Sequence, residues 1–375
     1  MGVRTAPDSR FMPKAGDSLK LLDTPALIVD LAVVEANIGK LFERVRGTKV
    51  AVRPHMKTAK CPEVARMYLA AGAEGICVAK VSEAEVMAAA GIEDILITTE
   101  IVGEIKVKRL IELLRQHPKI KIVVDSIVAA AAIDRAAGHL ESKIAVLIEV
   151  NVGQNRAGVE PNQAALKLAQ DLQHCKNLRL VGVQGYEGHL QMLPDHKERE
   201  RLCREAMSKL TATADLLRAN GLAIDVVTTG GTGTSEFCAD CSAVTEIQPG
   251  SFVFMDVAYR GAAGSVYGQA LSLLATVISK PAASRVVIDA GLKSLSTDSG
   301  FAEVRDYPQY KYRPGGDEHG ILETDESAMS LAIGERVHLI PSHIDTTVNL
   351  HDYYFCHRGG VLEQIWPIAA RGKVQ

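Results

Sequence analysis

Short apolar runs alternate with helical patterns between residues 50 and 254, and this alternation restricts the chain to few folds. Most of the runs are continuously apolar, which is typical of parallel strands buried on both faces. Eight strands joined by helical crossovers over about 240 residues predict a (β/α)8 barrel of the TIM type. A doubly wound open sheet has the same periodicity and is the alternative. The expected strands are residues 50–52, 75–78, 95–98, 122–124, 145–150, 180–184, 224–228 and 252–254.

The segments between these strands carry apolar residues at helical spacing. We expect helices at residues 62–71, 82–90, 104–117, 127–137, 161–174 and 197–220. Before them, residues 26–29 predict a short strand, and Asp30 suits the N-cap of a helix that follows. This early strand could either pair with a later part of the chain or lead into the barrel.

The pattern changes after about residue 265. Residues 270–278, 285–288, 336–340, 346–355 and 361–368 read as strands joined by Gly, Pro and Asp turns, without a long helical pattern. We therefore expect an α/β chain with two domains. The barrel would occupy residues 25–265, and a C-terminal, mostly β domain would comprise residues 1–24 and 266–375.

The composition is that of an ordinary soluble protein, with 47% hydrophobic residues, 23% charged residues and a net charge of −3. It gives no basic excess to hold nucleic acid. No apolar run is long enough to cross a bilayer, and the polar N-terminal segment does not resemble a signal peptide, so we expect a cytoplasmic protein without membrane partners. Seven cysteines without a disulfide framework predict free thiols.

The stretch Arg53-Pro54-His55-Met56-Lys57 follows the first barrel strand directly. In barrels, catalytic groups come from the carboxyl ends of the strands. A lysine amine in a dry pocket loses its proton readily and can attack a carbonyl carbon. Lys57 is therefore a candidate nucleophile, although an ordinary solvated lysine is the alternative. Polar residues at the other strand ends are Asn151, Gln154, Arg156, Tyr186, Glu187, His189, Gln191, Asp256 and Tyr259.

The seventh strand is followed by Thr229-Gly230-Gly231-Thr232-Gly233-Thr234. Glycines let backbone N–H groups converge on one anion, and threonine hydroxyls add donors. Phosphate sites in barrels often use the loops after strands seven and eight. The loop lacks Walker and dinucleotide spacing, and a flexible turn is the alternative. A phosphate site facing a lysine suggests pyridoxal 5'-phosphate.

The C-terminal domain contains His343 and Asp345 in the run 341–352. On a strand these side chains would point to the same face, so both could bind one ion. An imidazole with a carboxylate suits manganese, magnesium or cobalt better than a thiolate zinc site. Simple hydrogen bonding is the alternative, because this spacing is common.

Taken together, the motifs resemble the D-threonine aldolase branch of the D-serine dehydratase-like family, which are fold-type III pyridoxal enzymes with an alanine racemase-type barrel. The resemblance runs from about Thr24 to the C-terminus. It is carried by Thr24-Pro25, Arg53–Lys57, Lys80–Ala84, Val152–Arg156, Thr229–Thr234, Asp289–Ser294, Asp317–Gly320, Pro341–Asp352 and Ala369–Gly372.

The resemblance implies a role for each matching residue. Lys57 would be the Schiff-base lysine, and His343 with Asp345 would bind the metal. The remaining cofactor-binding residues would be Arg156 and Tyr186 near the ring, and Gly231, Thr232, Gly233, Thr234, Gly250 and Ser251 around the phosphate.

The resemblance also implies a reaction, the cleavage of D-β-hydroxy-α-amino acids such as D-threonine, D-allo-threonine or D-phenylserine to glycine and an aldehyde. Asp345 favours the aldolases, since the dehydratases of the family carry Cys at this position. D-3-hydroxyaspartate aldolase, D-serine or 3-hydroxyaspartate dehydratase, a metal-free racemase and a non-enzymatic cofactor-binding protein are the alternatives. The family also implies a homodimer. Departures at Ala59, Glu187 and Met192 leave the substrate side chain open.

Overall fold

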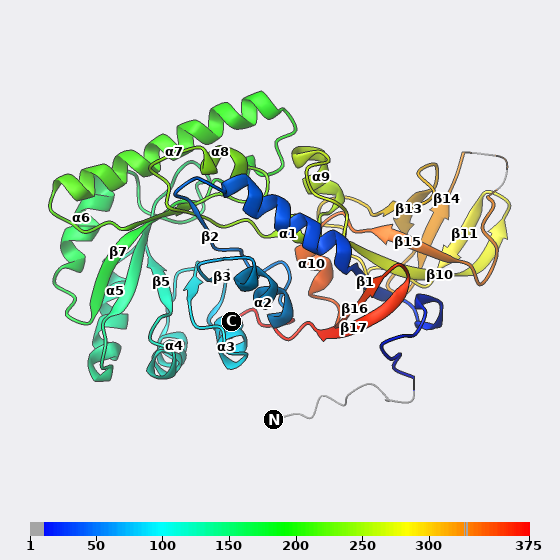
Figure 1. Ribbon diagram of the computed structural model, residues 1–375, viewed down its shortest axis with the longest axis horizontal. Coiled ribbons are helices and arrows are strands. Elements are labelled where there is room, and N and C mark those ends of the chain that lie inside the picture. Colours follow the sequence, from blue (N-terminus) through cyan, green and yellow to red (C-terminus); the bar gives the residue numbers. More distant parts are fainter. Residues whose placement is uncertain (1–10, 326, 328) are drawn as a thin grey trace. The chain divides into compact units, whose positions relative to one another are not determined.

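The computed structural model describes residues 11–325, 327 and 329–375, and they form two compact units (Figure 1). The barrel unit contains Ile38–Phe252, Tyr259–Val266 and Gly372–Gln375. The sheet unit contains the described residues up to Asn37 together with Val253–Ala258 and Tyr267–Arg371. The predicted division at residues 25 and 265 differs from this mainly because residues 26–37 lie in the sheet unit.

Among the described residues of the barrel unit, eight parallel strands pair in the order β2-β9-β8-β7-β6-β5-β4-β3. A further parallel bridge joins His55, just after β2, to Cys77 in β3, so the first and last strands of this order are also paired. The predicted barrel is therefore confirmed, and the open-sheet alternative is wrong. The strands are β2 (Ala51–Val52), β3 (Ile76–Val78), β4 (Ile95–Ile97), β5 (Lys121–Val124), β6 (Ile144–Glu149), β7 (Leu178–Gln184), β8 (Val226–Thr229) and β9 (Glu246–Ile247).

Helices alternate with these strands and lie outside them, as α3 to α7 show in Figure 1. Local sequence explains several helix starts. Pro62 opens α2 without losing a helical hydrogen bond, and the Ser126 and Asp195 side chains cap α5 and α7. The helices are α2 (Pro62–Ala70), α3 (Val81–Ala89), α4 (Glu104–Gln116), α5 (Ile127–Ala136), α6 (Gln163–Leu172), α7 (His196–Ala219) and α8 (Ser235–Ala239).

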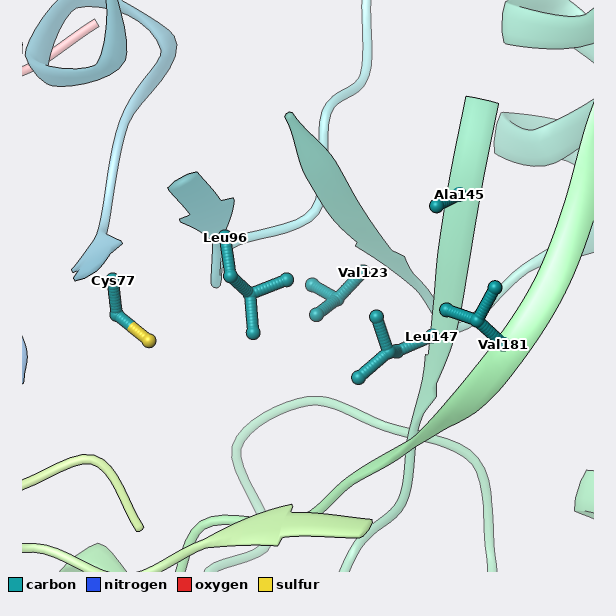
Figure 2. Close-up of a cluster of buried hydrophobic side chains, with 6 residues drawn as sticks. All are labelled: Cys77, Leu96, Val123, Ala145, Leu147 and Val181. Carbon is teal, nitrogen blue, oxygen red and sulfur yellow. The ribbon is translucent and has the colours of Figure 1, made fainter. Parts of the chain in front are cut away.

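A cluster of buried apolar side chains from neighbouring strands gathers in the barrel unit (Figure 2). Its members are Cys77, Leu96, Val123, Ala145, Leu147 and Val181. Alternate side chains of a strand share a face. Thr98 and Glu149 each lie two residues beyond a member of the cluster, so the core leads directly to polar groups at the carboxyl ends of the strands.

Arg53 lies at the opposite end of this core. It was expected among the polar groups at the strand ends, but its guanidinium binds Glu246 and Asp94 at 2.7 and 2.6 Å. Glu246 begins β9, and Asp94 directly precedes β4, so both carboxylates belong to the amino-terminal ends of their strands. Arg53 is 3% exposed, and it therefore joins the barrel strands rather than facing the mouth.

The predicted eighth strand at residues 252–254 is wrong, because Ser251–Val253 form a 3-10 turn, η4. The eighth strand of the barrel is instead β9. Phe252, Val253 and Phe254 are fully buried. Their apolar run therefore reflects burial, and periodicity alone cannot distinguish a buried turn from a buried strand.

In the sheet unit, nine strands of the described chain pair in the order β11-β14-β13-β12-β15-β10-β1-β16-β17. Strand β1 pairs with β10 and β16, so the early strand belongs to this sheet and not to the barrel. The strands are β1 (Ala26–Asp30), β10 (Leu271–Ala282), β11 (Arg285–Ile288), β12 (Glu303–Val304), β13 (Lys311–Pro314), β14 (Gly320–Glu323), β15 (Arg336–Ile340), β16 (Tyr353–Arg358) and β17 (Val361–Pro367).

The described residues also form the helices α1 (Leu31–Val45), α9 (Val257–Ala263) and α10 (Ile344–Val348). The start of the predicted strand at residues 346–355 is wrong, since α10 occupies it and β16 begins only at Tyr353. Nowhere in the described ranges does a helix combine the length and the hydropathy of a membrane span.

Candidate active site and metal-binding residues

A cavity that is partly open to solvent lies at the carboxyl ends of the barrel strands. All the residues that line it belong to the barrel unit. Of the predicted cofactor site, Lys57, Arg156, Tyr186, Gly231, Thr232, Gly250 and Ser251 line the cavity. The structure therefore brings together loops that are separated by almost 200 residues. The other lining residues are His55, Thr58, Ala79, Thr98, Thr99, Glu100, Glu149, Gln184, Gly230, Gln248 and Tyr259.

Two cations lie near the ring of Tyr186. The Nζ atom of Lys57 lies 5.7 Å from the ring centroid, and Cζ of Arg156 lies 5.6 Å from it. Both distances are within the range of cation–π attraction. Tyr186 thus holds a primary amine and a guanidinium at one cavity, where an anionic or carbonyl-bearing ligand would meet both.

His55 links the Lys57 backbone to strand β4 through a chain of hydrogen bonds. The Lys57 N–H donates to His55 Nδ1 at 3.2 Å, so the neutral ring carries its proton on Nε2. His55 Nε2 then donates to Thr98 Oγ1 at 3.0 Å, and this hydroxyl donates to Val78 O. Burial holds the pKa of His55 well below its usual value, and nearby positive charges lower it further. His55 therefore orients the loop as a neutral ring.

The Gly-rich loop is held from behind by Glu187 and Gln191. The Glu187 carboxylate accepts hydrogen bonds from Thr229, Gly230, Thr234 and Gln191. Gln191 Oε1 accepts from the Gly233 N–H at 2.9 Å. Among the described residues, the predicted pair Gly233 and Thr234 does not line the cavity. Their polar groups support the loop from its buried side.

The remaining part of the predicted anion cradle does face the cavity. The hydrogen bonds of the described residues leave the backbone N–H groups of Thr232 and Gly250 available. Thr232 Oγ1 accepts from Phe252 N at 3.0 Å, which ties the two loops together. Ser251 adds a hydroxyl at the start of η4. These donors carry no negative charge, so their chemistry fits a phosphate.

Two acidic side chains line the same cavity. Burial raises the pKa of Glu149 to about 8, although Gln184 donates a hydrogen bond to its carboxylate at 2.5 Å. Burial also raises the pKa of Glu100. This pKa keeps Glu149 mostly protonated at pH 7. Gln248 extends its network by donating to Gln184 at 3.0 Å.

A buried cluster of Glu187, Cys203 and Cys238 lies under the loop, with the two sulfur atoms 3.6 Å apart. Its ligand types could suit a metal ion. However, both oxygens of Glu187 already accept hydrogen bonds. The hydrogen bond from Cys203 and burial also raise the pKa of Cys238, so its thiol stays protonated. We interpret the cluster as packing that supports the loop.

The predicted metal pair lies in the sheet unit. His343 directly precedes α10 and Asp345 lies within its first turn, so the predicted strand geometry is wrong. The two side chains still meet, with His343 Nε2 at 3.8 Å from Asp345 Oδ2. Ligand atoms at about 2.0–2.2 Å from one ion are at most about 4.4 Å apart, so this separation fits a shared cation.

Asp298 contacts the other nitrogen of the same imidazole, with 2.6 Å between its Oδ2 and His343 Nδ1. Burial opposes its ionisation, but hydrogen bonds from Ser296, His343 and Thr346 lower the pKa of Asp298 to about 2. Asp298 lies 45 residues before His343, and no local motif in the sequence points to it. Thr98, Glu100 and Glu149 were also missed, although Thr98 ends a predicted strand, Glu149 is the penultimate residue of another, and Glu100 closely follows the first.

Comparison with known proteins agrees with the division of the chain into two units. Residues 29–257 match the alanine racemase N-terminal domain, and residues 270–357 match the serine dehydratase domain. A D-threonine aldolase from Arthrobacter sp. is 42% identical over 95% of each chain. The chain belongs to the D-threonine aldolase-like family. A crystal structure of D-threonine aldolase from Filomicrobium marinum superimposes with a TM-score of 0.93, at 37% identity, covering 97% of this chain and 100% of that one.

Other members of the D-threonine aldolase-like family carry different reaction names. A 3-hydroxy-D-aspartate aldolase from Paracoccus denitrificans (strain Pd 1222) is 34% identical, covering 94% of this chain and 93% of its own. A D-threo-3-hydroxyaspartate dehydratase from Delftia sp. (strain HT23) is 32% identical, covering 96% and 97%. The family therefore includes both carbon–carbon cleavage and elimination.

Proposed function

We propose that this protein is a pyridoxal phosphate- and metal-dependent lyase that cleaves D-β-hydroxy-α-amino acids to glycine and an aldehyde. One observation carries the proposal: Lys57 and the donors at Thr232, Gly250 and Ser251 line one cavity. An amine and a phosphate-binding cradle are what the two ends of pyridoxal phosphate require. The family to which the chain belongs is also pyridoxal phosphate-dependent.

Different residues of the cavity would bind different parts of pyridoxal phosphate. The Lys57 amine would hold the cofactor's aldehyde carbon, while Thr232, Gly250 and Ser251 would donate hydrogen bonds to its phosphate. Tyr186 would pack near the ring. His55 keeps its proton at Nε2 and accepts from the Lys57 N–H, which fixes the backbone that carries the amine.

His343 and Asp345 would hold a divalent cation, for which manganese, magnesium and cobalt suit a ligand pair of nitrogen and oxygen. When bound, pyridoxal phosphate supplies an electron sink for breaking the Cα–Cβ bond, and the cation favours loss of the β-hydroxyl proton. A solved variant of a D-threo-3-hydroxyaspartate dehydratase is described as being in the metal-free form.

We favour aldol cleavage over elimination as the reaction, because Asp345 provides a carboxylate at a position where the dehydratases of the D-serine dehydratase-like family carry a cysteine. A carboxylate suits harder ions than a thiolate does. Within the aldolases, D-threonine and D-phenylserine are the first substrates to test, and D-3-hydroxyaspartate is the second candidate because of the Paracoccus relative.

Product analysis of the purified protein tests the proposal. We expect an aldehyde and glycine from D-threonine or D-phenylserine, with activity lost in EDTA and restored by Mn²⁺. Lys57→Ala should lose the visible absorption of the bound cofactor. Asp345→Ala should lose metal-dependent cleavage but keep that absorption.

Several results would contradict the proposal. Ammonia and a keto acid as the main products would assign the protein to the dehydratases. Full activity after chelation would show that the reaction needs no metal. An unchanged visible band in Lys57→Ala would show that Lys57 does not bind the cofactor. Lys106→Ala, which changes an exposed lysine of α4, is the matched control and should behave as the wild type.

A further inference from the structure

We propose that Asp298 is a positioning residue for the metal site, because it fixes the proton of His343 on Nδ1 and thereby turns the Nε2 lone pair toward Asp345. This inference rests on the proposed function in one respect, namely that His343 and Asp345 hold a divalent cation. It adds a residue that does not itself contact the cation.

The Asp298 carboxylate accepts hydrogen bonds from three side chains. Its Oδ1 accepts from Ser296 Oγ at 2.6 Å and from Thr346 Oγ1 at 2.8 Å. Its Oδ2 lies 2.6 Å from His343 Nδ1. An ionised carboxylate has no proton to give, so the proton between Asp298 and His343 belongs to the imidazole.

The loop that carries Asp298 is attached to the segment that carries His343. The Ser296 N–H donates to Thr347 Oγ1 at 3.3 Å, and Ser342 Oγ donates to Ser296 O at 3.3 Å. His351 Nε2 reaches Ser294 O at 2.8 Å. These contacts lie before, within and after α10, so Asp298 is held in place independently of its bond to the imidazole.

The position of the proton decides what Nε2 can do. With Nδ1 protonated, the neutral ring presents an unprotonated Nε2, and this atom faces Asp345 Oδ2 at 3.8 Å. Two acceptors facing each other repel unless a cation lies between them. Histidine ligands commonly donate their second ring N–H to a carboxylate, which fixes the tautomer and the ring orientation. Asp298 would serve this purpose here.

A manganese titration separates this role from a direct ligand role. The pyridoxal phosphate-loaded protein is stripped with EDTA, dialysed and titrated with MnCl₂, and free Mn²⁺ is measured by its electron paramagnetic resonance signal. We expect Asp298→Ala to weaken Mn²⁺ binding by about 10–100-fold, the usual loss for such partners. Asp298→Asn, which keeps the shape and an acceptor oxygen, should fall between wild type and Asp298→Ala. His343→Ala should abolish binding at this site.

Activity and stability measurements exclude a merely structural effect. The Mn²⁺ concentration for half-maximal activity of Asp298→Ala should rise by the same factor as its dissociation constant, while the rate at saturating Mn²⁺ returns close to the wild-type value. The melting temperature and the visible band of the cofactor should stay near those of the wild type. Asp325→Ala, which changes an exposed carboxylate of the same unit paired with Lys311, is the matched control.

The outcomes are distinguishable. Mn²⁺ binding by both Asp298 variants within twofold of wild type, with binding lost in His343→Ala, would overturn the positioning role and leave the proposed function intact. A wild-type protein without Mn²⁺ binding, or a His343→Ala variant that binds as the wild type does, would overturn both. If Asp298→Ala fails to fold, the Asp298→Asn titration decides.

Discussion

The backbone N–H of Lys57 donates to Nδ1 of His55 over 3.2 Å, so the proposed cofactor lysine is anchored by a neighbouring imidazole. This bond requires an unprotonated Nδ1. Protonation of His55 would break it and would place a further positive charge beside the Lys57 amine. The arrangement therefore connects the local structure of the site to the ionisation of one histidine.

His55 should make the folded protein less stable as the pH falls. Burial and nearby cations lower its pKa in the folded state, while the unfolded value is about 6.5. Below that value the unfolded chain binds the proton first, so stability falls by up to about 1.4 kcal/mol per pH unit. His55→Gln should lose part of this dependence. Urea unfolding of both proteins at pH 7.5 and 5.5 measures the difference, and parallel losses would contradict the assignment.

Glu149 should make the folded protein less stable as the pH rises, which is opposite to the effect of His55. Its folded-state pKa of about 8 lies above the unfolded value, so the unfolded chain releases its proton first as the pH rises. The stability of the wild type should therefore fall between about pH 4.3 and pH 8, by up to about 1.4 kcal/mol per unit. Glu149→Gln keeps an acceptor for Gln184 and should gain stability relative to the wild type on going from pH 5 to pH 9.

Thermal unfolding at these two pH values measures the gain of Glu149→Gln. Glu104→Gln, at an exposed position of α4, is the control and should show no such gain. An equal difference between Glu149→Gln and the wild type at both pH values would show that Glu149 ionises normally in the fold.

Arg53→Ala should strongly destabilise the barrel. It would leave the Glu246 carboxylate, which is 7% exposed, without its cation, and also remove the ion pair to Asp94. Breaking one side of a buried pair costs about 3–5 kcal/mol. Lys119→Ala removes a solvent-exposed pair with Glu93 and should leave the free energy of unfolding nearly unchanged. Comparable losses in urea unfolding for both variants would refute the structural role of Arg53.

Gly231→Ala should weaken cofactor binding. An added Cβ would lie 2.4 Å from Gln191 Oε1, so Gln191 would have to move. Gln191 bonds to Gly233 and Thr234, and the loss of two such bonds costs about 1–3 kcal/mol. We expect a rise of about 10–100-fold in the dissociation constant of pyridoxal phosphate, measured by absorption titration. Gly39→Ala, which meets nothing within 4 Å, should bind normally.

The barrel fold could be predicted because buried parallel strands leave continuous apolar runs. The position of the eighth strand could not, since Phe252–Phe254 are equally apolar without pairing in a strand. The helix α10 was also missed, because its β-branched residues favour strands by propensity and only the surrounding structure overrides this.

In the candidate site, too, only the features with a local sequence motif could be predicted. Lys57 and the Gly-rich loop could be proposed from the sequence because each has a local motif, and the structure places Lys57, Gly231 and Thr232 at one cavity. Asp298 could not be found in this way, since its significance comes from a hydrogen bond to a residue 45 positions away. Gly233 and Thr234 looked equivalent to Thr232 in the sequence, and only the backbone path reveals that they face Gln191 and Glu187.

The pairing of β1 with β10 and β16 has a practical consequence for anyone who divides this gene. A fragment ending at residue 265 would contain β1 but neither of its partners, and it would offer an uncovered apolar strand edge for aggregation. A barrel meant to be produced alone should therefore leave out β1, and a graft of the sheet unit onto another enzyme should carry residues 11–37 with it.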